Sequence, residues 1–317
     1  MTETLFAPQL QPVWVLLIAI LVERLWAWPD RYHPLGFVRL IAKQMAAKVN
    51  HNDNNAFQQK IAGALAPTVL LLPFIIGATI LIQLAEFPLF FDGLLLLVAL
   101  QFKPVTDRVR RVSNALERNK KALARDILQY LCLRETQQLS VIGISKAAIE
   151  TLLLRYCYQY VAVMFWFLAL GGVGAISYRL VYEFSLHWNT KLERYRHFGT
   201  PVARLSQFLY WLPARIMIAG LMLSENISGS FRALRQRKNR NTHTAILAAC
   251  GGGLKVQLSG PVMYRGQKYR YAKLGASRLP ETQDIRRSLN ALDKTLAILL
   301  VFSLLIAAML YGLRKLL

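Results

Sequence analysis

The chain has 317 residues, of which 55% are apolar, and a formal net charge of +22. The apolar fraction excludes an intrinsically disordered protein, and three cysteines without a pairing pattern exclude a disulfide scaffold and a zinc ribbon. A chain this basic suggests a nucleic-acid binder, whereas a chain this apolar suggests a membrane protein. The placement of the charge along the chain decides between the two.

Two apolar stretches are long enough to cross a membrane. Residues 61–84 carry no charged side chain, and residues 296–313 form an unbroken run of apolar or small residues. As a helix, the first stretch would extend about 36 Å, which exceeds a hydrocarbon core of about 30 Å. Both stretches are therefore predicted to be transmembrane helices.

Four further stretches are predicted to lie in the membrane on weaker patterns. They cover residues 10–28, 89–102, 157–178 and 208–223. The last of them contains Pro213, which predicts a broken or re-entrant helix. The predicted fold is all-α, a polytopic membrane helical bundle formed by a single domain over residues 1–317.

Basic residues gather between the apolar stretches. Residues 103–155 hold eleven Lys or Arg against five Asp or Glu, and residues 224–294 hold fourteen against four. Because basic loops mark the cytoplasmic side of a membrane protein, both segments are predicted to be cytoplasmic, with the N-terminus outside. Apolar residues recur at helical spacing within 103–155, which predicts amphipathic helices there. The charge is thereby explained, so the predicted partner is the lipid bilayer and not a nucleic acid.

The sequence shows no familiar catalytic or metal-binding signature, and its five histidines lack paired ligand spacing. Polar residues instead adjoin the apolar stretches, where an ionisable group is costly unless it is paired or hydrated. From the residues alone, functional groups and structural salt bridges fit this set equally well. The set includes Arg134, Thr136, Glu150, Glu183, Tyr195, Arg204 and Arg215.

Short motifs follow one another along nearly the whole chain. They are His33-Pro34 with Val38 through Ile41, Arg134-Glu135-Thr136, Ala147 through Thr151, Tyr178-Arg179, Glu193-Arg194-Tyr195, Ala203-Arg204, Leu212 through Arg215, and Leu258 through Pro261. In order and spacing, these motifs resemble those of the CobD/CbiB family of integral membrane proteins.

The resemblance implies a bacterial inner-membrane enzyme of cobalamin biosynthesis, adenosylcobinamide-phosphate synthase. Such an enzyme joins adenosylcobyric acid to aminopropanol phosphate as an amide, with Mg-ATP as the cofactor. By this resemblance Glu150 and Glu183 are the candidate catalytic residues, as metal ligands or bases. The candidate contacts for a phosphorylated or other anionic small molecule are Arg134, Thr136, Arg179, Tyr195, Arg204 and Arg215.

The chain departs from the family pattern at its acidic motifs. Leu154 and Tyr158 stand where the family has Glu and Asp, Ser185 replaces another Asp, and Ser206-Gln207 replace an Asp pair. These changes predict a pseudoenzyme, a member of the family whose catalysis is weakened or lost. The alternative is a non-catalytic membrane sensor or regulator of the AmpE type that binds an anionic ligand. A transporter is a third possibility, although no internal repeat is visible.

Overall fold

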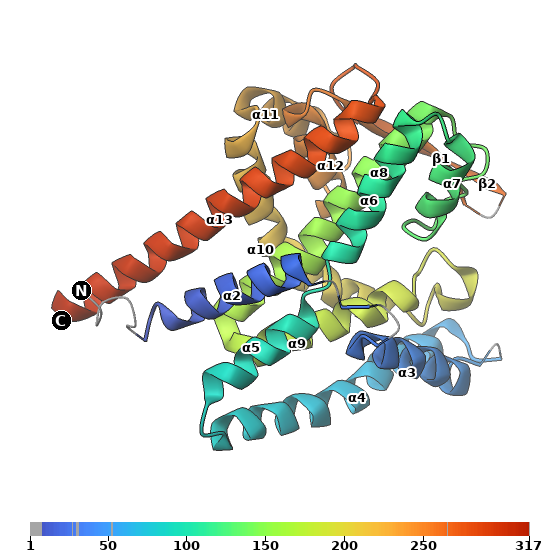
Figure 1. Ribbon diagram of the computed structural model, residues 1–317. Helices are drawn as coiled ribbons and strands as arrows, with labels where there is room; N and C mark the ends of the chain where they lie inside the picture. The colour runs from blue at the N-terminus through green and yellow to red at the C-terminus, as the bar shows by residue number, and fades with distance from the viewer. Residues whose placement is uncertain (1–7, 27, 30–31, 52, 265, 317) are drawn as a thin grey trace. The chain divides into compact units, whose positions relative to one another are not determined.

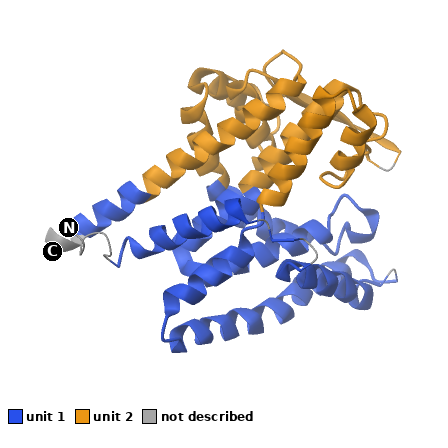
Figure 2. Cartoon of the chain, in the orientation of Figure 1, with its two compact units in different colours: residues 1–101, 158–213, 304–317 blue, residues 102–157, 214–303 orange. Residues whose placement is uncertain are grey.

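The structure is a computed structural model that describes residues 8–26, 28–29, 32–51, 53–264 and 266–316. Its backbone divides into two compact units, which Figure 2 shows in different colours. Unit 1 comprises residues 1–101, 158–213 and 304–317, and unit 2 comprises residues 102–157 and 214–303. The chain therefore passes repeatedly between the units, and each unit is assembled from segments far apart in the sequence.

Unit 1 is helical throughout its described part (Figure 1). Its elements are α2 (Gln11–Leu25), α3 (Pro34–Val49), α4 (Ala56–Leu84), α5 (Pro88–Ala99), α9 (Ala162–His187), the 3-10 turn Glu193–Tyr195 and the first half of α10 (Thr200–Ser224). Helix α9 is its centre, because α2, α3, α4 and α5 all pack against it. The start of α4 shows why a helix begins there: the Asn55 side chain accepts the backbone N–H of Gln58, and the Gln58 side chain accepts that of Asn55.

Four stretches in the described part of the chain are long and apolar enough to cross a membrane. They are Ala56–Leu84, Pro88–Glu117, Val141–His187 and Thr282–Leu313. Two of them correspond to the strongest predictions, 61–84 and 296–313, and both expose most of their apolar side chains, as a lipid-facing helix does. The predicted membrane helical bundle is confirmed. Helix α2, with 15 residues, is about 22 Å long, so a crossing over residues 10–28 stays a prediction.

The helix break lies in α9 and not at Pro213. Helix α10 runs from Thr200 to Ser224 with Pro213 inside it. In α9 the backbone leaves the helical region at Leu170 (φ −138°, ψ 15°) and at Gly171 (φ 69°, ψ −164°). A φ of 69° is readily adopted only by glycine. Pro213 therefore lies within a helix, and a re-entrant course of residues 208–223 through the membrane stays a prediction.

Unit 2 carries the amphipathic helices and also strands. Its elements are α6 (Lys103–Glu117), α7 (Lys121–Gln129), α8 (Val141–Tyr156), the second half of α10, α11 (Ile227–Gln236), α12 (Thr242–Gly253), β1 (Gln257–Tyr264), β2 (Gln267–Gly275) and most of α13 (Thr282–Leu316). A π-helical turn, Cys157–Val161, follows α8. The periodic apolar residues of α6, which include Val105, Val109 and Val112, are buried against neighbours such as α7 and α8, as the helical spacing predicts.

The hairpin of β1 and β2 is the exception to the all-helical prediction. The two strands pair antiparallel from Gln257↔Gly275 to Tyr264↔Gln267, with an irregularity between Ser259 and Pro261. The sequence predicted only a basic cytoplasmic segment over residues 224–294, from its excess of Lys and Arg. A two-stranded hairpin depends on pairing and on packing against α12, which local periodicity does not report.

Candidate functional site

A buried charged cluster in unit 1 contains five polar side chains, which we call the Arg179 cluster. Its members are Arg39, Gln101, Arg179, Glu183 and His187. Glu183 is fully buried and accepts hydrogen bonds from Arg179 Nη2 at 2.7 Å and from Arg39 Nε at 3.3 Å. Gln101 Oε1 accepts from Arg39 Nη2 at 2.8 Å and from Arg179 Nη2 at 3.4 Å. Two guanidinium groups thus share one carboxylate.

The helices of unit 1 place these groups with little freedom. Arg179 and Glu183 are one turn apart on α9, so their side chains lie on the same face. Helix α3, which carries Arg39, is fixed to the end of α9 by the indole of Trp188, which donates to Ala42 O at 3.0 Å. Gln101 follows the end of α5. The cluster is therefore set on packed helices and not on a mobile loop.

Arg179 is the least satisfied member of the cluster. Its side chain is only 1% exposed, and neither Nε nor Nη1 has a hydrogen-bond partner among the described residues. The ring of Tyr182 lies 5.7 Å from the guanidinium carbon and covers one face of it. Buried donors without partners are costly and rare. The hydrogen-bonding capacity of Nε and Nη1 is therefore left over for a water molecule or a ligand.

A second charged cluster lies in unit 2, and here the groups satisfy one another. Arg134 Nη2 lies 2.5 Å from Glu150 Oε2, and the backbone N–H of Ser259 donates to Glu150 Oε1. Burial opposes the charge of Arg134, but attraction to the Glu150 carboxylate outweighs it, so the pKa of Arg134 lies above its ordinary value. Ser259 adopts φ 60° to present its N–H. Both Glu150 oxygens are occupied, so this cluster fastens α8 to β1.

Two reactive side chains beside the second cluster stay protonated. Burial raises the pKa of the Cys132 thiol, and the nearby Arg134 only partly offsets this effect. Burial likewise raises the pKa of the Tyr264 phenol. A thiol attacks as the thiolate, so Cys132 is a poor nucleophile at neutral pH.

The structure brings together some of the predicted site residues and separates others. It pairs Arg179 with Glu183 in unit 1 and Arg134 with Glu150 in unit 2. Thr136 is buried, and its hydroxyl has no hydrogen-bond partner in the described part of the chain. Tyr195 is half-buried under the guanidinium of Arg194. Arg204 and Arg215 are exposed on α10, so neither forms part of a buried clamp.

Three members of the Arg179 cluster were not among the predicted site residues: Arg39, Gln101 and His187. Arg39 did belong to one of the motifs that carry the family resemblance, and that was the available signal. Gln101 is a polar residue at the end of an apolar run, and His187 follows Glu183 by four residues. The pairing of Arg39 with Glu183 spans 144 positions of sequence, and no local pattern predicts such a contact.

Neither candidate carboxylate, Glu150 or Glu183, is open to a magnesium ion as the described side chains lie. Mg²⁺ binds through carboxylate and other oxygen ligands, but the described part of the chain holds no group of three His, Cys, Asp or Glu side chains that could hold a metal ion. The oxygens of Glu183 face Arg39 and Arg179, and those of Glu150 face Arg134 and a backbone N–H. A cation at either carboxylate would have to displace a guanidinium.

Comparison with known proteins gives a consistent family match. Residues 16–292 match the family model described as CobD/Cbib protein. Over 301 residues the chain is 32% identical to the cobalamin biosynthesis protein CobD of Chromobacterium violaceum, which covers 93% of this chain and 96% of that protein. It is 26% identical to the protein of the same name from Stutzerimonas stutzeri, over 86% of this chain and 90% of that protein. It is also 26% identical to the one from Mycobacterium tuberculosis, over 90% of this chain and 95% of that protein. No solved structure matches.

Proposed function

Because this multi-pass membrane protein belongs to the CobD/CbiB family, we propose that it acts in cobalamin biosynthesis by binding a phosphorylated or other anionic small molecule at the Arg179 cluster. The observation that carries the proposal is the buried guanidinium of Arg179, which keeps two donor nitrogens without a partner among the described residues. Curated relatives that align over most of the chain are named cobalamin biosynthesis protein CobD, which supports the pathway.

The charges of the cluster favour an anion. Arg39 and Arg179 carry two positive charges against the single negative charge of Glu183, so the cluster has an excess of one positive charge. The side chain of Arg39 is 33% exposed, whereas Arg179 and Glu183 are buried. Arg39 therefore lies where a ligand can enter, and Arg179 would bind the anion deeper in the site. A guanidinium offers paired donors that match phosphate or carboxylate oxygens.

The proposal includes weakened or lost ligation by this chain. Activation of a carboxylic acid by ATP would need Mg²⁺ beside the phosphates, and the two candidate carboxylates, Glu150 and Glu183, are committed to arginines. In this chain, Glu183 would position the two guanidinium groups and limit their positive charge. It would not bind a metal or take a proton from the substrate.

A genetic test separates ligation from binding. A strain that lacks its own family enzyme should not regain cobinamide amidation when it expresses this protein, although the protein accumulates in its membrane. Aminopropanol phosphate, the phosphorylated substrate that the resemblance implies, should still raise the unfolding temperature of the purified protein. Restored amidation would overturn the proposed loss of catalysis. Binding without restored amidation would support a sensor or regulator of the AmpE type.

A further inference from the structure

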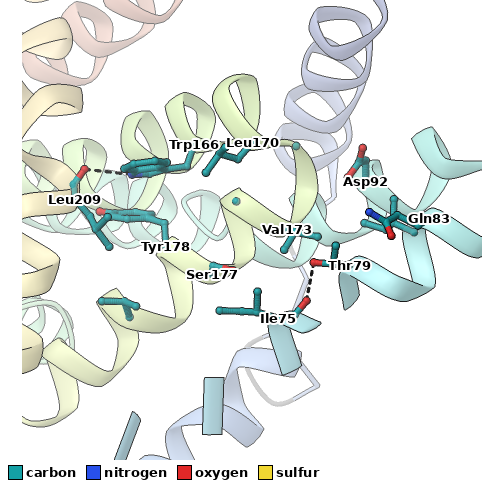
Figure 3. A pocket seen from close by; sticks show the side chains of 14 residues that line it. Ile75, Thr79, Gln83, Asp92, Trp166, Leu170, Val173, Ser177, Tyr178 and Leu209 are labelled. Carbon is teal, nitrogen blue, oxygen red and sulfur yellow. Dashed lines mark hydrogen bonds between the residues drawn. The ribbon is translucent and has the colours of Figure 1, made fainter. Parts of the chain in front are cut away.

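A cavity of about 560 Å³ lies in unit 1, and no member of the Arg179 cluster lines it. Helices α4, α5, α9 and α10 contribute its walls. Figure 3 shows Asp92 and Gln83 on one side of it, with the rings of Trp166 and Tyr178 across from them. Its volume is within the range of ordinary small-molecule sites, roughly 300–1,000 Å³.

Asp92 is the acidic side chain of this cavity. One oxygen, Oδ1, accepts the backbone N–H of Gly172 at 2.8 Å, which caps the second half of α9 just after its break. The other oxygen, Oδ2, has no hydrogen bond, and Asp92 has no basic partner among the described residues. This open carboxylate oxygen can accept a hydrogen bond from a cation that enters the cavity.

The cavity is polar at one end and apolar at the other. Asp92 lies in the second turn of α5 and Gln83 in the last turn of α4, on either side of the short connection between the two helices. Ile75 lies eight residues before Gln83, about 12 Å further along α4. The carboxylate and the amide are therefore near the end of two membrane helices, where lipid headgroups lie, and the apolar wall extends toward the bilayer interior.

We propose that this cavity binds an amphiphile whose primary ammonium group pairs with Asp92 Oδ2 and whose hydrocarbon part lies along the apolar wall. The shape and polarity match a phospholipid with an ammonium headgroup, or a soluble amine with an apolar tail. The hydroxyl of Ser177, which is buried without a hydrogen-bond partner in the described part of the chain, lines the same cavity and offers a further acceptor. This site is separate from the Arg179 cluster, which attracts the opposite charge.

The test is lipid binding by the full-length protein in neutral maltoside micelles, followed by native mass spectrometry. Dioleoyl phosphatidylethanolamine, which has a primary ammonium, is compared with dioleoyl phosphatidylglycerol, which has none. We expect the first lipid to bind at a concentration at least about tenfold lower, which corresponds to about 1.4 kcal/mol. Asp92→Asn should abolish that preference, because asparagine still caps the helix but carries no charge.

Glu86→Gln is the matched control, because Glu86 is an exposed acid in the connection between the same two helices. This variant should keep the preference for phosphatidylethanolamine. Displacement of that lipid by butylammonium would assign a soluble amine, and failure to displace it would assign the lipid itself. Equal binding of the two lipids by the unsubstituted protein, or an unchanged preference in Asp92→Asn, would overturn the proposal. An unchanged unfolding temperature would show that Asp92→Asn is folded.

Discussion

Glu183→Gln is expected to lower the free energy of unfolding by about 3–5 kcal/mol, the usual cost of removing one partner from a buried ion pair. Glutamine keeps the shape of the side chain, but it leaves Arg39 and Arg179 facing each other without a carboxylate. Arg179 is 1% exposed and cannot recover its hydration. Chemical denaturation in detergent micelles, followed by tryptophan fluorescence, measures the change.

Glu193→Gln is the control for this substitution. Glu193 is also an acid of unit 1, but its side chain is exposed. Its replacement should change the free energy of unfolding by no more than about 0.5 kcal/mol, as for ordinary surface positions. If Glu183→Gln lowered the free energy of unfolding as little as the control does, the assignment of Glu183 as the carboxylate that holds both guanidinium groups would be contradicted.

The second large effect is expected for Gly63→Ala, in α4. A Cβ atom at position 63 would lie 1.8 Å from the carbonyl oxygen of Phe198, far inside van der Waals contact. Because the obstacle is backbone, relief requires α4 to move away from the segment that precedes α10. Overpacking of this kind typically costs about 1–3 kcal/mol, and a backbone obstacle places Gly63→Ala at or above the upper end.

Gly77→Ala in the same helix is the matched control. A Cβ at position 77 would meet no atom within 4 Å, and alanine favours a helix over glycine by about 0.5–1 kcal/mol. Gly63→Ala should therefore lower the unfolding temperature. Gly77→Ala should leave the unfolding temperature unchanged or raise it. Equal shifts would show that α4 does not lie against Phe198 as described.

The membrane helices were predictable because their signal is local. An apolar run of sufficient length can satisfy its backbone in lipid only as a helix, so 61–84 and 296–313 could be assigned from composition alone. The buried face of α6 followed equally from the spacing of Val105, Val109 and Val112. The carboxylate of Asp92, which caps α9 at Gly172 just after the break, stands 80 positions away, and no local pattern reports that contact.

The candidate site was predictable in part. Glu183 and Arg179 stand four residues apart on one helix, so their pairing could be expected once the helix was predicted. Arg39 reaches the Glu183 carboxylate from α3, and Gln101 reaches the Arg179 guanidinium from the residues just after α5. Only the packing of α3 and α5 against α9 brings them there. Arg204 and Arg215 were expected from their motifs to contact an anionic ligand; α10 exposes both, and that contact stays a prediction.

The measurement that tests the central claim most directly is calorimetric titration of aminopropanol phosphate into Arg179→Met and Arg204→Met. Charge-assisted hydrogen bonds contribute about 1.5–3 kcal/mol, so Arg179→Met should weaken binding about 10- to 150-fold. Arg204→Met removes an exposed arginine of the same unit and should bind as the unsubstituted protein does. Equal affinities in the two variants, or a loss confined to Arg204→Met, would contradict the account.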